Sequence, residues 1–356
     1  MSGTSLDGID AALILTDGEH VEVCDATSYI PYKAEMRIKI KSLNRPDPQN
    51  VDGYAGIVKE LTMLNVKAVE EVLKYSRLTR AQIGVIGFHG QTVFHMPEAH
   101  LSIQLGDGKL LAKKTGIPVV GNMRAADIKA GGQGAPLTPL YHLSLSRACT
   151  YPVGILNIGG VANLTWIGET GANMYENIVA FDTGPGNALI DDWVCKQKLG
   201  SHDVSGRIAA KGHINSKILS ALLSHTYFNK IPPKSLDRNQ FCLSSIVNLT
   251  PEDGAATLTA FTAHAVKKGL YHVPEYPNKV LVCGGGRKNE EMMRMLTEIL
   301  NIPVEPVENV GWSGDYIEAE AFAYLAVRSL YGKILSLPST TGVDKPLTGG
   351  TLFHPM

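Results

Sequence analysis

The sequence is poor in the features that mark secreted, membrane-spanning and metal-cluster proteins. Its five cysteines are odd in number, far apart and never form a Cys-x-x-Cys pair, which argues against a disulfide framework and a zinc site. No basic segment followed by an apolar one opens the chain, and no run of about 18 apolar residues occurs. We therefore expect a soluble cytoplasmic protein with no membrane partner.

An excess of charge of either sign is also missing. The chain has 33 Lys and Arg residues against 34 Asp and Glu residues, a formal net charge of -1. Such a balance gives no long-range attraction for nucleic acid or an anionic membrane. The absence of a long basic stretch also makes an exopolyphosphatase-like function the weaker alternative. Small neutral or anionic ligands fit this composition better.

Several common catalytic and phosphate-binding motifs are absent. There is no Gly-x-x-x-x-Gly-Lys-Ser/Thr and no complete Gly-x-Gly-x-x-Gly after a strand. Their absence argues against a P-loop and against a Rossmann nucleotide-binding site. Neither a Gly-x-Ser-x-Gly nor a His-Glu-x-x-His segment is present, which removes two common hydrolase classes. Three separate glycine turns remain to be explained.

The length and the pattern of elements indicate a two-lobed α/β protein. A chain of 356 residues exceeds the size that one hydrophobic core usually serves, and ligands usually bind in the cleft between two lobes. The glycine-rich stretch Ala130–Pro136 is the expected crossing point. We predict a first lobe of residues 1–130 plus 316–356 and a second lobe of residues 131–315.

Local patterns predict the main elements of both lobes. Strand-forming residues on either side of Asp17–Gly18 indicate a β-hairpin, and another hairpin is expected around Gly159–Gly160. Apolar residues at helical spacing predict amphipathic helices. The predicted helices are 54–75, 187–198, 255–269, 289–300 and 316–330, and the predicted strands are 9–16, 21–27, 84–88, 117–120, 154–158, 161–167 and 178–181.

The first glycine turn opens the chain. Its glycines let backbone amides approach an anion and its hydroxyls can donate to phosphate oxygens, while Asp7 is suited to hold Mg²⁺ through water. A plain β-turn is the alternative reading. The nucleotide-binding residues expected in this turn are Gly3, Thr4, Ser5, Leu6, Asp7, Gly8, Ile9 and Asp10.

The second and third turns each follow a strand and lead toward a helix. In Phe181–Asn187, Asp182 ends a strand before Gly184 and Gly186, and a helix that follows would favour a phosphate. A carboxylate there can accept a proton from the attacking nucleophile, although a helix cap is the alternative. The third turn could offer a flat surface to a purine or serve helix packing; its glycines are Gly284, Gly285 and Gly286.

The order of the three turns resembles that of the actin, hexokinase and Hsp70 superfamily, whose two-lobed, ribonuclease H-like fold has a deep interlobe cleft. Within it, the chain is similar over nearly its whole length to the anhydro-N-acetylmuramic acid kinase family. The segments that carry this narrower resemblance are Met1–Asp10, Gly87–Thr92, Ala130–Pro136, Asn157–Asn163, Phe181–Asn187 and Val282–Gly286.

The family resemblance implies a reaction and its participants. Using ATP and Mg²⁺, the family opens the 1,6-anhydro bridge of anhydro-N-acetylmuramic acid with water and phosphorylates O6, giving N-acetylmuramic acid 6-phosphate and ADP in peptidoglycan recycling. Asp182 matches the catalytic aspartate. Arg124 and Glu318 match sugar-contacting positions, and Gln91 is placed with them. His89 is expected to be a buried core imidazole.

The sequence departs from the family pattern in two places, and two alternative functions remain compatible with it. Family members carry several residues before the stretch that begins here at Met1, and the segment Pro232–Arg238 follows the family pattern only in part. The rivals are a levoglucosan-type anhydro sugar kinase and a non-catalytic nucleotide-binding regulator of the same fold. The oligomeric state is left open, with a homodimer as one alternative.

Overall fold

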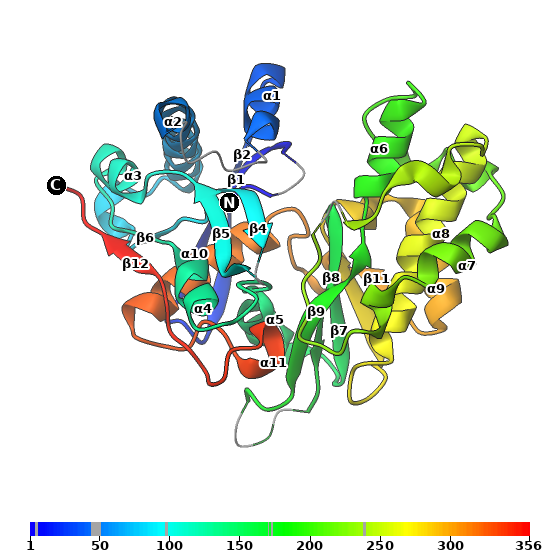
Figure 1. The fold of residues 1–356 in the computed structure, drawn as a ribbon. Coiled ribbons are helices and arrows are strands. Elements are labelled where there is room, and N and C mark those ends of the chain that lie inside the picture. The colour runs from blue at the N-terminus through cyan, green and yellow to red at the C-terminus, as the bar shows by residue number, and fades with distance from the viewer. Residues whose placement is uncertain (4–5, 44–50, 97–98, 170, 172–173, 238–239) are drawn as a thin grey trace. The chain divides into compact units, whose positions relative to one another are not determined.

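A computed structural model describes residues 1–3, 6–43, 51–96, 99–169, 171, 174–237 and 240–356. The chain forms two compact units (Figure 1). Unit 1 contains Met1–Leu145 and Tyr316–Met356, and unit 2 contains Ser146–Asp315. Within the described ranges, no helix is both long and apolar enough to cross a membrane.

The boundary between the units falls after Leu145 rather than at residue 130. The glycine-rich stretch turns back onto unit 1, because the amide of Gly134 donates to Oδ1 of Asp127 at 2.6 Å and the amide of Gln133 donates to the carbonyl of Thr341 at 2.6 Å. Helix α5 (Pro139–Leu145) then packs on helix α10 (Ile317–Leu330). Positive φ angles at the glycines bend the chain here without separating the units.

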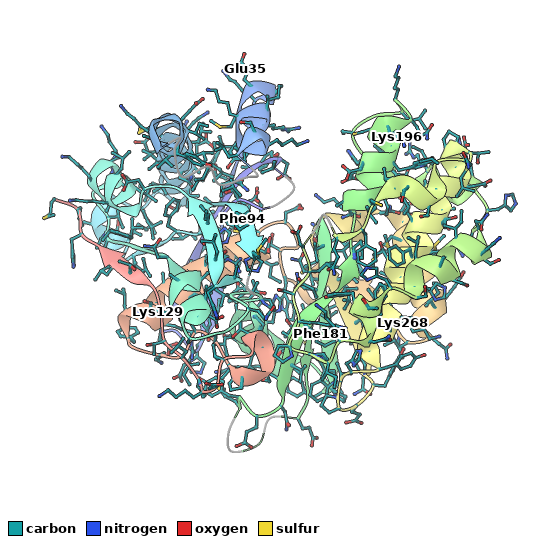
Figure 2. The ribbon with its side chains drawn as sticks, in the orientation of Figure 1. Glu35, Phe94, Lys129, Phe181, Lys196 and Lys268 are labelled. Carbon is teal, nitrogen blue, oxygen red and sulfur yellow. The ribbon has the colours of Figure 1, made fainter. Side chains whose placement is uncertain are left out.

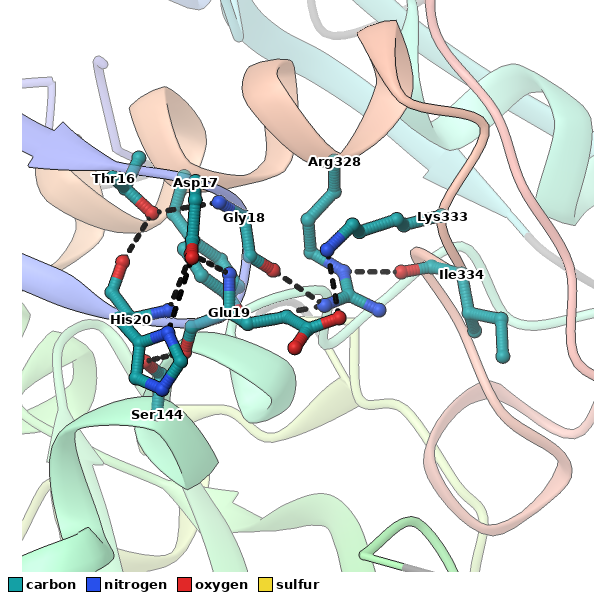
Figure 3. A network of polar contacts seen from close by, with 10 residues as sticks. Thr16, Asp17, Gly18, Glu19, His20, Ser144, Arg328, Lys333 and Ile334 are labelled. Carbon is teal, nitrogen blue, oxygen red and sulfur yellow. Dashed lines mark hydrogen bonds and ion pairs between the residues drawn. The ribbon is translucent and has the colours of Figure 1, made fainter.

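The predicted opening hairpin is confirmed. Strand β1 (Gly8–Thr16) pairs with the antiparallel strand β2 (Val21–Pro31), and their connection is held by a buried arginine at the end of α10 (Figure 3). Arg328 donates from Nη1 to the carbonyl of Gly18 at 2.7 Å and from Nε to the carbonyl of Ile334 at 2.6 Å. The hairpin is thereby fixed to the last turn of α10.

The rest of unit 1 is a small sheet with covering helices. Strand β6 (Val119–Gly121) lies between the parallel strand β3 (Ile86–Gly87) and the antiparallel strand β12 (Thr351–Phe353). A Cβ at Gly87 would lie 2.0 Å from the carbonyl oxygen of Phe322, so α10 packs directly on the strand. The other elements are β4 (Gln91–Met96), β5 (Leu101–Leu105), α1 (Ala34–Ser42), α2 (Val51–Ser76), α3 (Gly108–Thr115), α4 (Met123–Lys129) and α11 (Pro338–Thr341).

Unit 2 is built on a five-stranded sheet with the order β11-β10-β7-β8-β9. Strands β7, β8 and β9 form an antiparallel meander, whereas β10 runs parallel to both β7 and β11. This order and these directions match the ribonuclease H-like arrangement. The carboxyl ends of β7, β9 and β10 therefore meet at one edge. The bounds are β7 (Val153–Ile158), β8 (Val161–Ile167), β9 (Ile178–Pro185), β10 (Lys279–Cys283) and β11 (Val304–Pro306).

Helices cover the sheet of unit 2 and bury its core. Figure 1 shows α7, α8 and α9 on one side of the strands, and Figure 2 shows Phe181 among the side chains packed there. Lys196, at the end of α6, extends away from the unit (Figure 2). The three helices predicted for this unit are confirmed as α6 (Ala188–Lys196), α8 (Pro251–Leu270) and α9 (Glu290–Leu300). The sequence patterns did not predict α7 (Ser216–Leu223).

Candidate functional site

The opening turn is attached to the rest of unit 1 through the carbonyl of Gly3. The carbonyl of Gly3 accepts hydrogen bonds from Nε2 of Gln91 at 3.0 Å and from the amide of Leu6 at 3.4 Å. Leu6 has a φ of 56° and is buried in the core of the hairpin. Two expected contacts, Thr4 and Ser5, lie outside the described residues. Gly3 and Leu6, the described residues on either side of them, are therefore each held by contacts within unit 1.

Part of the predicted nucleotide turn serves the hairpin. A Cβ at Gly8 would lie 2.5 Å from the carbonyl oxygen of Ile30, so this glycine allows the two strands to approach. Ile9 is 1% exposed and belongs to the core. These two residues thus have packing roles that their place in the motif did not reveal.

The two aspartates of the turn occupy different surroundings. Asp7 is exposed, and its Oδ1 accepts from the amide of Gly8 at 3.0 Å. Asp10 is half-buried in β1, where the Met1 amino group donates to its carbonyl at 2.8 Å. Burial lowers the pKa of that amino group, while the nearby charges of Asp10 and Glu318 oppose the shift. Glu318, in the first turn of α10, therefore lies in the same neighbourhood as Asp10.

An exposed carboxylate fits one kind of metal site. Within the described ranges, no group of three or more His, Cys, Asp or Glu side chains is arranged to hold a metal ion. Mg²⁺ commonly takes one or two carboxylates together with water and substrate phosphates. Asp7 can meet that requirement only if most of the ligands come from a nucleotide and solvent.

Asp182 lies within β9 rather than in a loop. The strand continues to Pro185, so the predicted turn from Phe181 to Asn187 is shorter than expected. Its carboxylate Oδ2 accepts from the amide of Leu236 at 2.7 Å, and its own amide donates to the carbonyl of Lys234 at 3.0 Å. The side chain is half-buried, and its carboxylate is oriented by the amide of Leu236.

A buried lysine supports the same strand and was missed by the sequence analysis. Lys234 is 5% exposed, with Nζ 4.9 Å from the ring centroid of Tyr227 and 5.8 Å from that of Phe181. Burial, assisted by the charge of Lys230, lowers the pKa of Lys234 to about 8. The Tyr227 hydroxyl in turn donates to the carbonyl of Asp182 at 2.5 Å. The family-like stretch around residue 234 was the available signal.

Three glycine-containing segments converge at the sheet edge where β7, β9 and β10 end. The amide of Gly186 donates to the carbonyl of Gly160 at 3.0 Å, and the amide of Asn187 donates to the carbonyl of Gly159 at 2.8 Å. Nδ2 of Asn187 also donates to the carbonyl of Ile158 at 3.1 Å. The Gly159–Gly160 hairpin is thus part of the site, which its sequence marked only as a tight turn.

These contacts change the roles expected for Gly184 and Gly186. Because hairpin carbonyls accept from the amides of Asn187 and Ala188, at 2.8 and 3.3 Å, these two amides at the start of α6 are already engaged. A Cβ at Gly186 would lie 2.4 Å from the carbonyl oxygen of Gly159, and one at Gly184 would lie 2.8 Å from Cβ of Ala265. Both glycines therefore permit close packing of the edge.

The third turn presents one glycine to open space. A Cβ at Gly284 would meet Oδ1 of Asn157 at 2.3 Å, and one at Gly286 would meet Cγ2 of Ile158 at 2.4 Å. At Gly285 the nearest atom would be Nδ2 of Asn187, at 3.8 Å. The turn closes as a short 3-10 helix, Gly285–Lys288. Gly285 is consequently the position where a missing side chain leaves room for a ligand.

An ion-pair network fixes this turn. Arg287 donates from Nη1 to the carbonyl of Gly284 at 2.9 Å and from Nε to Oε1 of Glu308 at 2.8 Å. Its Nη2 also lies 3.0 Å from Oδ2 of Asp315. Since the guanidinium is largely buried, these contacts hold the turn in one conformation.

One of the sugar-binding residues expected in unit 1, Arg124, contacts His89. Arg124, in the first turn of α4, directs Nε and Nη2 at Nε2 of His89, each at 3.0 Å, and donates from Nη1 to the carbonyl of Gly134 at 2.5 Å. Burial, and then the charge of Arg124, lowers the pKa of His89 well below its usual value. Gln91 differs from expectation, since it is 1% exposed and its side chain contacts Gly3.

A cavity of about 290 Å³ lies beside this group within unit 1. Its lining residues include the polar His89, Gln104 and Asn122 and the aromatic Phe88 and Phe353. A mixed lining of this kind suits a small polar ligand with one apolar face. His89 thus lines the cavity and also contacts Arg124, one of the expected sugar-binding residues.

The chain is similar over its whole length to a class of phosphotransferases, the small-molecule kinases. A family model described as anhydro-N-acetylmuramic acid kinase matches residues 1–355. Curated relatives of that name are 49% identical in Rhodospirillum rubrum, covering 99% of this chain and 92% of the relative, and 48% identical in Paramagnetospirillum magneticum, covering 98% and 97%. The chain therefore belongs to the anhydro-N-acetylmuramic acid kinase family, and it is an enzyme of the kinase class.

Similarity to solved structures is weaker. Component A of (R)-2-hydroxyglutaryl-CoA dehydratase from Acidaminococcus fermentans aligns with a TM-score of 0.45 at 13% identity, covering 91% of this chain and 99% of that one. A xylulose kinase from Bifidobacterium adolescentis aligns with a TM-score of 0.35 at 16% identity, covering 59% and 41%. At these TM-scores, the functional assignment rests on the family match alone.

Proposed function

We propose that this enzyme opens the 1,6-anhydro ring of anhydro-N-acetylmuramic acid with water and phosphorylates O6 with ATP, in peptidoglycan recycling. The observation that carries the proposal is the convergence of the Gly159, Gly186 and Gly285 segments at the edge of the unit 2 sheet, with Asp182 on the adjoining strand β9. In a member of this family, we assign the nucleotide and the general base to that edge of the sheet.

Asp182 acts in this proposal as general base for the attacking water. The water oxygen bonds to the anomeric carbon while its proton passes to the Asp182 carboxylate. The bond from that carbon to the bridge oxygen breaks, and the bridge oxygen bonds to the γ-phosphorus as ADP leaves. The hydrogen bond from Leu236 to Oδ2 keeps the carboxylate oriented throughout. Ring opening and phosphoryl transfer thus share one site.

Nucleotide-binding residues are assigned in each unit separately. In unit 2, Gly285 leaves space for the nucleoside, and in unit 1, Gly3 and Asp7 are assigned to the phosphates and their metal ion. Asp7 would hold Mg²⁺ through water, and the ion would neutralise charge on the phosphate oxygens when it is bound. The support for this assignment is the exposed Asp7 carboxylate and the open space at Gly285.

The sugar is assigned to unit 1. Arg124 and Glu318 are half-buried, and by its chemistry a glutamate carboxylate can accept from sugar hydroxyls, whereas a guanidinium can donate to hydroxyls or to a carboxylate. A fixed guanidinium suits the lactyl carboxylate of the amino sugar. This favours the proposed substrate over levoglucosan, which lacks both the lactyl and the acetamido group.

The experiment that tests the proposal measures the product as well as ADP. Purified enzyme is incubated with ATP, Mg²⁺ and either anhydro-N-acetylmuramic acid or levoglucosan, and the sugar products are analysed by mass spectrometry. The proposal expects a product that has gained one water and one phosphoryl group, with a higher kcat/KM for the amino sugar. A phosphorylated product that keeps its anhydro ring would contradict the hydrolytic step, and ATP binding without turnover would favour the regulator.

A further inference from the structure

We propose that the segment His89–Gln91 positions two separate parts of the site, with His89 orienting Arg124 for the sugar and Gln91 holding the opening turn for the nucleotide. This inference rests on the proposed function, because it assigns each residue to the binding of one of the two substrates. It replaces the sugar contact expected for Gln91.

The side chain of Gln91 is fully engaged inside unit 1. Its Oε1 accepts from the hydroxyl of Tyr32 at 3.3 Å, and its Nε2 donates to the carbonyls of Gly3 at 3.0 Å and of Thr92 at 3.1 Å. With 1% of its surface exposed, the amide has both of its polar atoms bound to protein groups. Gln91 therefore acts on the opening turn through the Gly3 carbonyl.

The neighbouring residue strengthens this connection. Ser2 pairs with Gln91 in a parallel β-bridge, and its Oγ donates to the carbonyl of Gly90 at 3.1 Å. Ser2 is 2% exposed, so these bonds are shielded from water. The start of the chain is thus tied to the segment that begins β4 at both Ser2 and Gly3.

His89 holds Arg124 by a different interaction. An arginine has only donors, so Nε2 of His89 must carry a lone pair toward the guanidinium and the ring is a neutral imidazole with its proton on Nδ1. Phe322 packs at a ring-centroid distance of 4.5 Å from His89 and lies 6.0 Å from the guanidinium carbon. His89 therefore holds one edge of the Arg124 guanidinium, and Phe322 packs near one of its faces.

The two contacts diverge because of the glycine between them. Gly90 has a φ of 74°, and a Cβ there would lie 2.6 Å from the carbonyl oxygen of Leu105. This left-handed turn allows His89 to serve α4 while Gln91 begins β4. Three consecutive residues can consequently serve two substrates independently.

A pair of variants separates the two positioning roles. Gln91→Met keeps the volume but removes both polar atoms, and His89→Phe removes the acceptor for Arg124. Steady-state KM values for ATP and for anhydro-N-acetylmuramic acid are measured with each, together with kcat and the Kd of each substrate by calorimetry. Thermal melting shows whether each variant folds.

Each variant is expected to weaken the binding of one substrate and to leave the binding of the other nearly unchanged. Loss of a buried hydrogen-bond partner should raise the KM and Kd for ATP ~10-fold in Gln91→Met, with the sugar KM changed less than ~2-fold. His89→Phe should raise the sugar KM ~10-fold with the ATP KM nearly unchanged. His89→Gln, which supplies a carbonyl oxygen to Arg124, should recover part of the sugar affinity.

Three outcomes would overturn the inference. A rise in the sugar KM alone in Gln91→Met would mean that Gln91 contacts the sugar. Equal changes in both KM values for either variant would show a general structural effect, and unchanged KM values would show no positioning role. If Gln91→Met does not fold, Tyr32→Phe tests the same hydrogen-bond chain and should raise the ATP KM. Failure of the wild-type enzyme to release ADP with sugar would instead refute the proposed function.

Discussion

The backbone amide of Leu236 donates a 2.7 Å hydrogen bond to Oδ2 of Asp182. The Asp182 amide donates in return to the carbonyl of Lys234, so two hydrogen bonds join Asp182 of strand β9 to the segment 234–236. A candidate base that is oriented by backbone groups keeps its direction even when its charge is removed. This relationship allows the chemical role of the carboxylate to be separated from its place in the fold.

Replacement Asp182→Asn should abolish turnover and leave nucleotide binding intact. The asparagine carbonyl oxygen can still accept from Leu236, whereas the amide cannot take the proton of the attacking water. We expect kcat to fall at least ~10³-fold, since general base catalysis commonly contributes ~10²–10⁴-fold. Sugar-dependent ADP release and the Kd for ATP are the measurements. The exposed Asp192→Asn serves as control, and retention of most activity in Asp182→Asn would exclude its role as base.

Two neighbouring glycines should respond differently to alanine. Gly285→Ala adds a methyl group to open space, so the melting temperature should stay close to that of the wild type while the Kd for ATP rises. Gly286→Ala places its methyl group against Ile158 and should destabilise the protein by about 1–3 kcal/mol. Calorimetry with ATP and thermal melting distinguish the two effects. Unchanged ATP affinity in Gly285→Ala would remove this turn from the nucleotide site.

The buried Lys234 should give the protein a distinctive dependence of stability on pH. Its pKa is about 8 in the folded protein, below the ordinary value of 10.5, so the unfolded chain binds more protons between these values. The cost of burying the charge is present below pH 8, and stability rises with pH until about 10.5 by at most about 1.4 kcal/mol per unit. Urea unfolding of wild type and Lys234→Met, measured from pH 7 to pH 10.5, should show this difference. A difference independent of pH would mean that Lys234 titrates normally.

Removal of the buried guanidinium in Figure 3 should destabilise unit 1. Arg328→Met keeps most of the volume but leaves the carbonyls of Gly18 and Ile334 without their donor. We expect a loss of about 2–4 kcal/mol in the free energy of unfolding. Lys333→Met, which removes the more exposed ion pair with Glu19, should cost about 1 kcal/mol or less. Equal losses in the two variants would contradict the central role of Arg328.

The sequence predicted regular elements well because their periodicity is local. The opening hairpin, α8 and α10 all lie close to the expected bounds. Roles that depend on distant contacts were harder to predict. Nothing local to Gln91 shows that its amide reaches Gly3. Nothing local to Gly186 shows that a Cβ there would collide with the carbonyl oxygen of Gly159.

The domain boundary illustrates the same limit. Glycine-rich sequence between Gly131 and Gly134 does interrupt regular structure, but a bonded turn and a domain crossing have the same composition. The buried Asp127 decides between them, because its carboxylate accepts from the amide of Gly134 and from the hydroxyl of Thr341. Only the fold brings residue 341 to this position.

The most direct test of the proposed function is ADP release by the purified enzyme with ATP and Mg²⁺, measured with and without anhydro-N-acetylmuramic acid. The account predicts release that depends on the sugar, saturates with its concentration and is lost in Asp182→Asn. The same rate of ADP release with and without the sugar would contradict it.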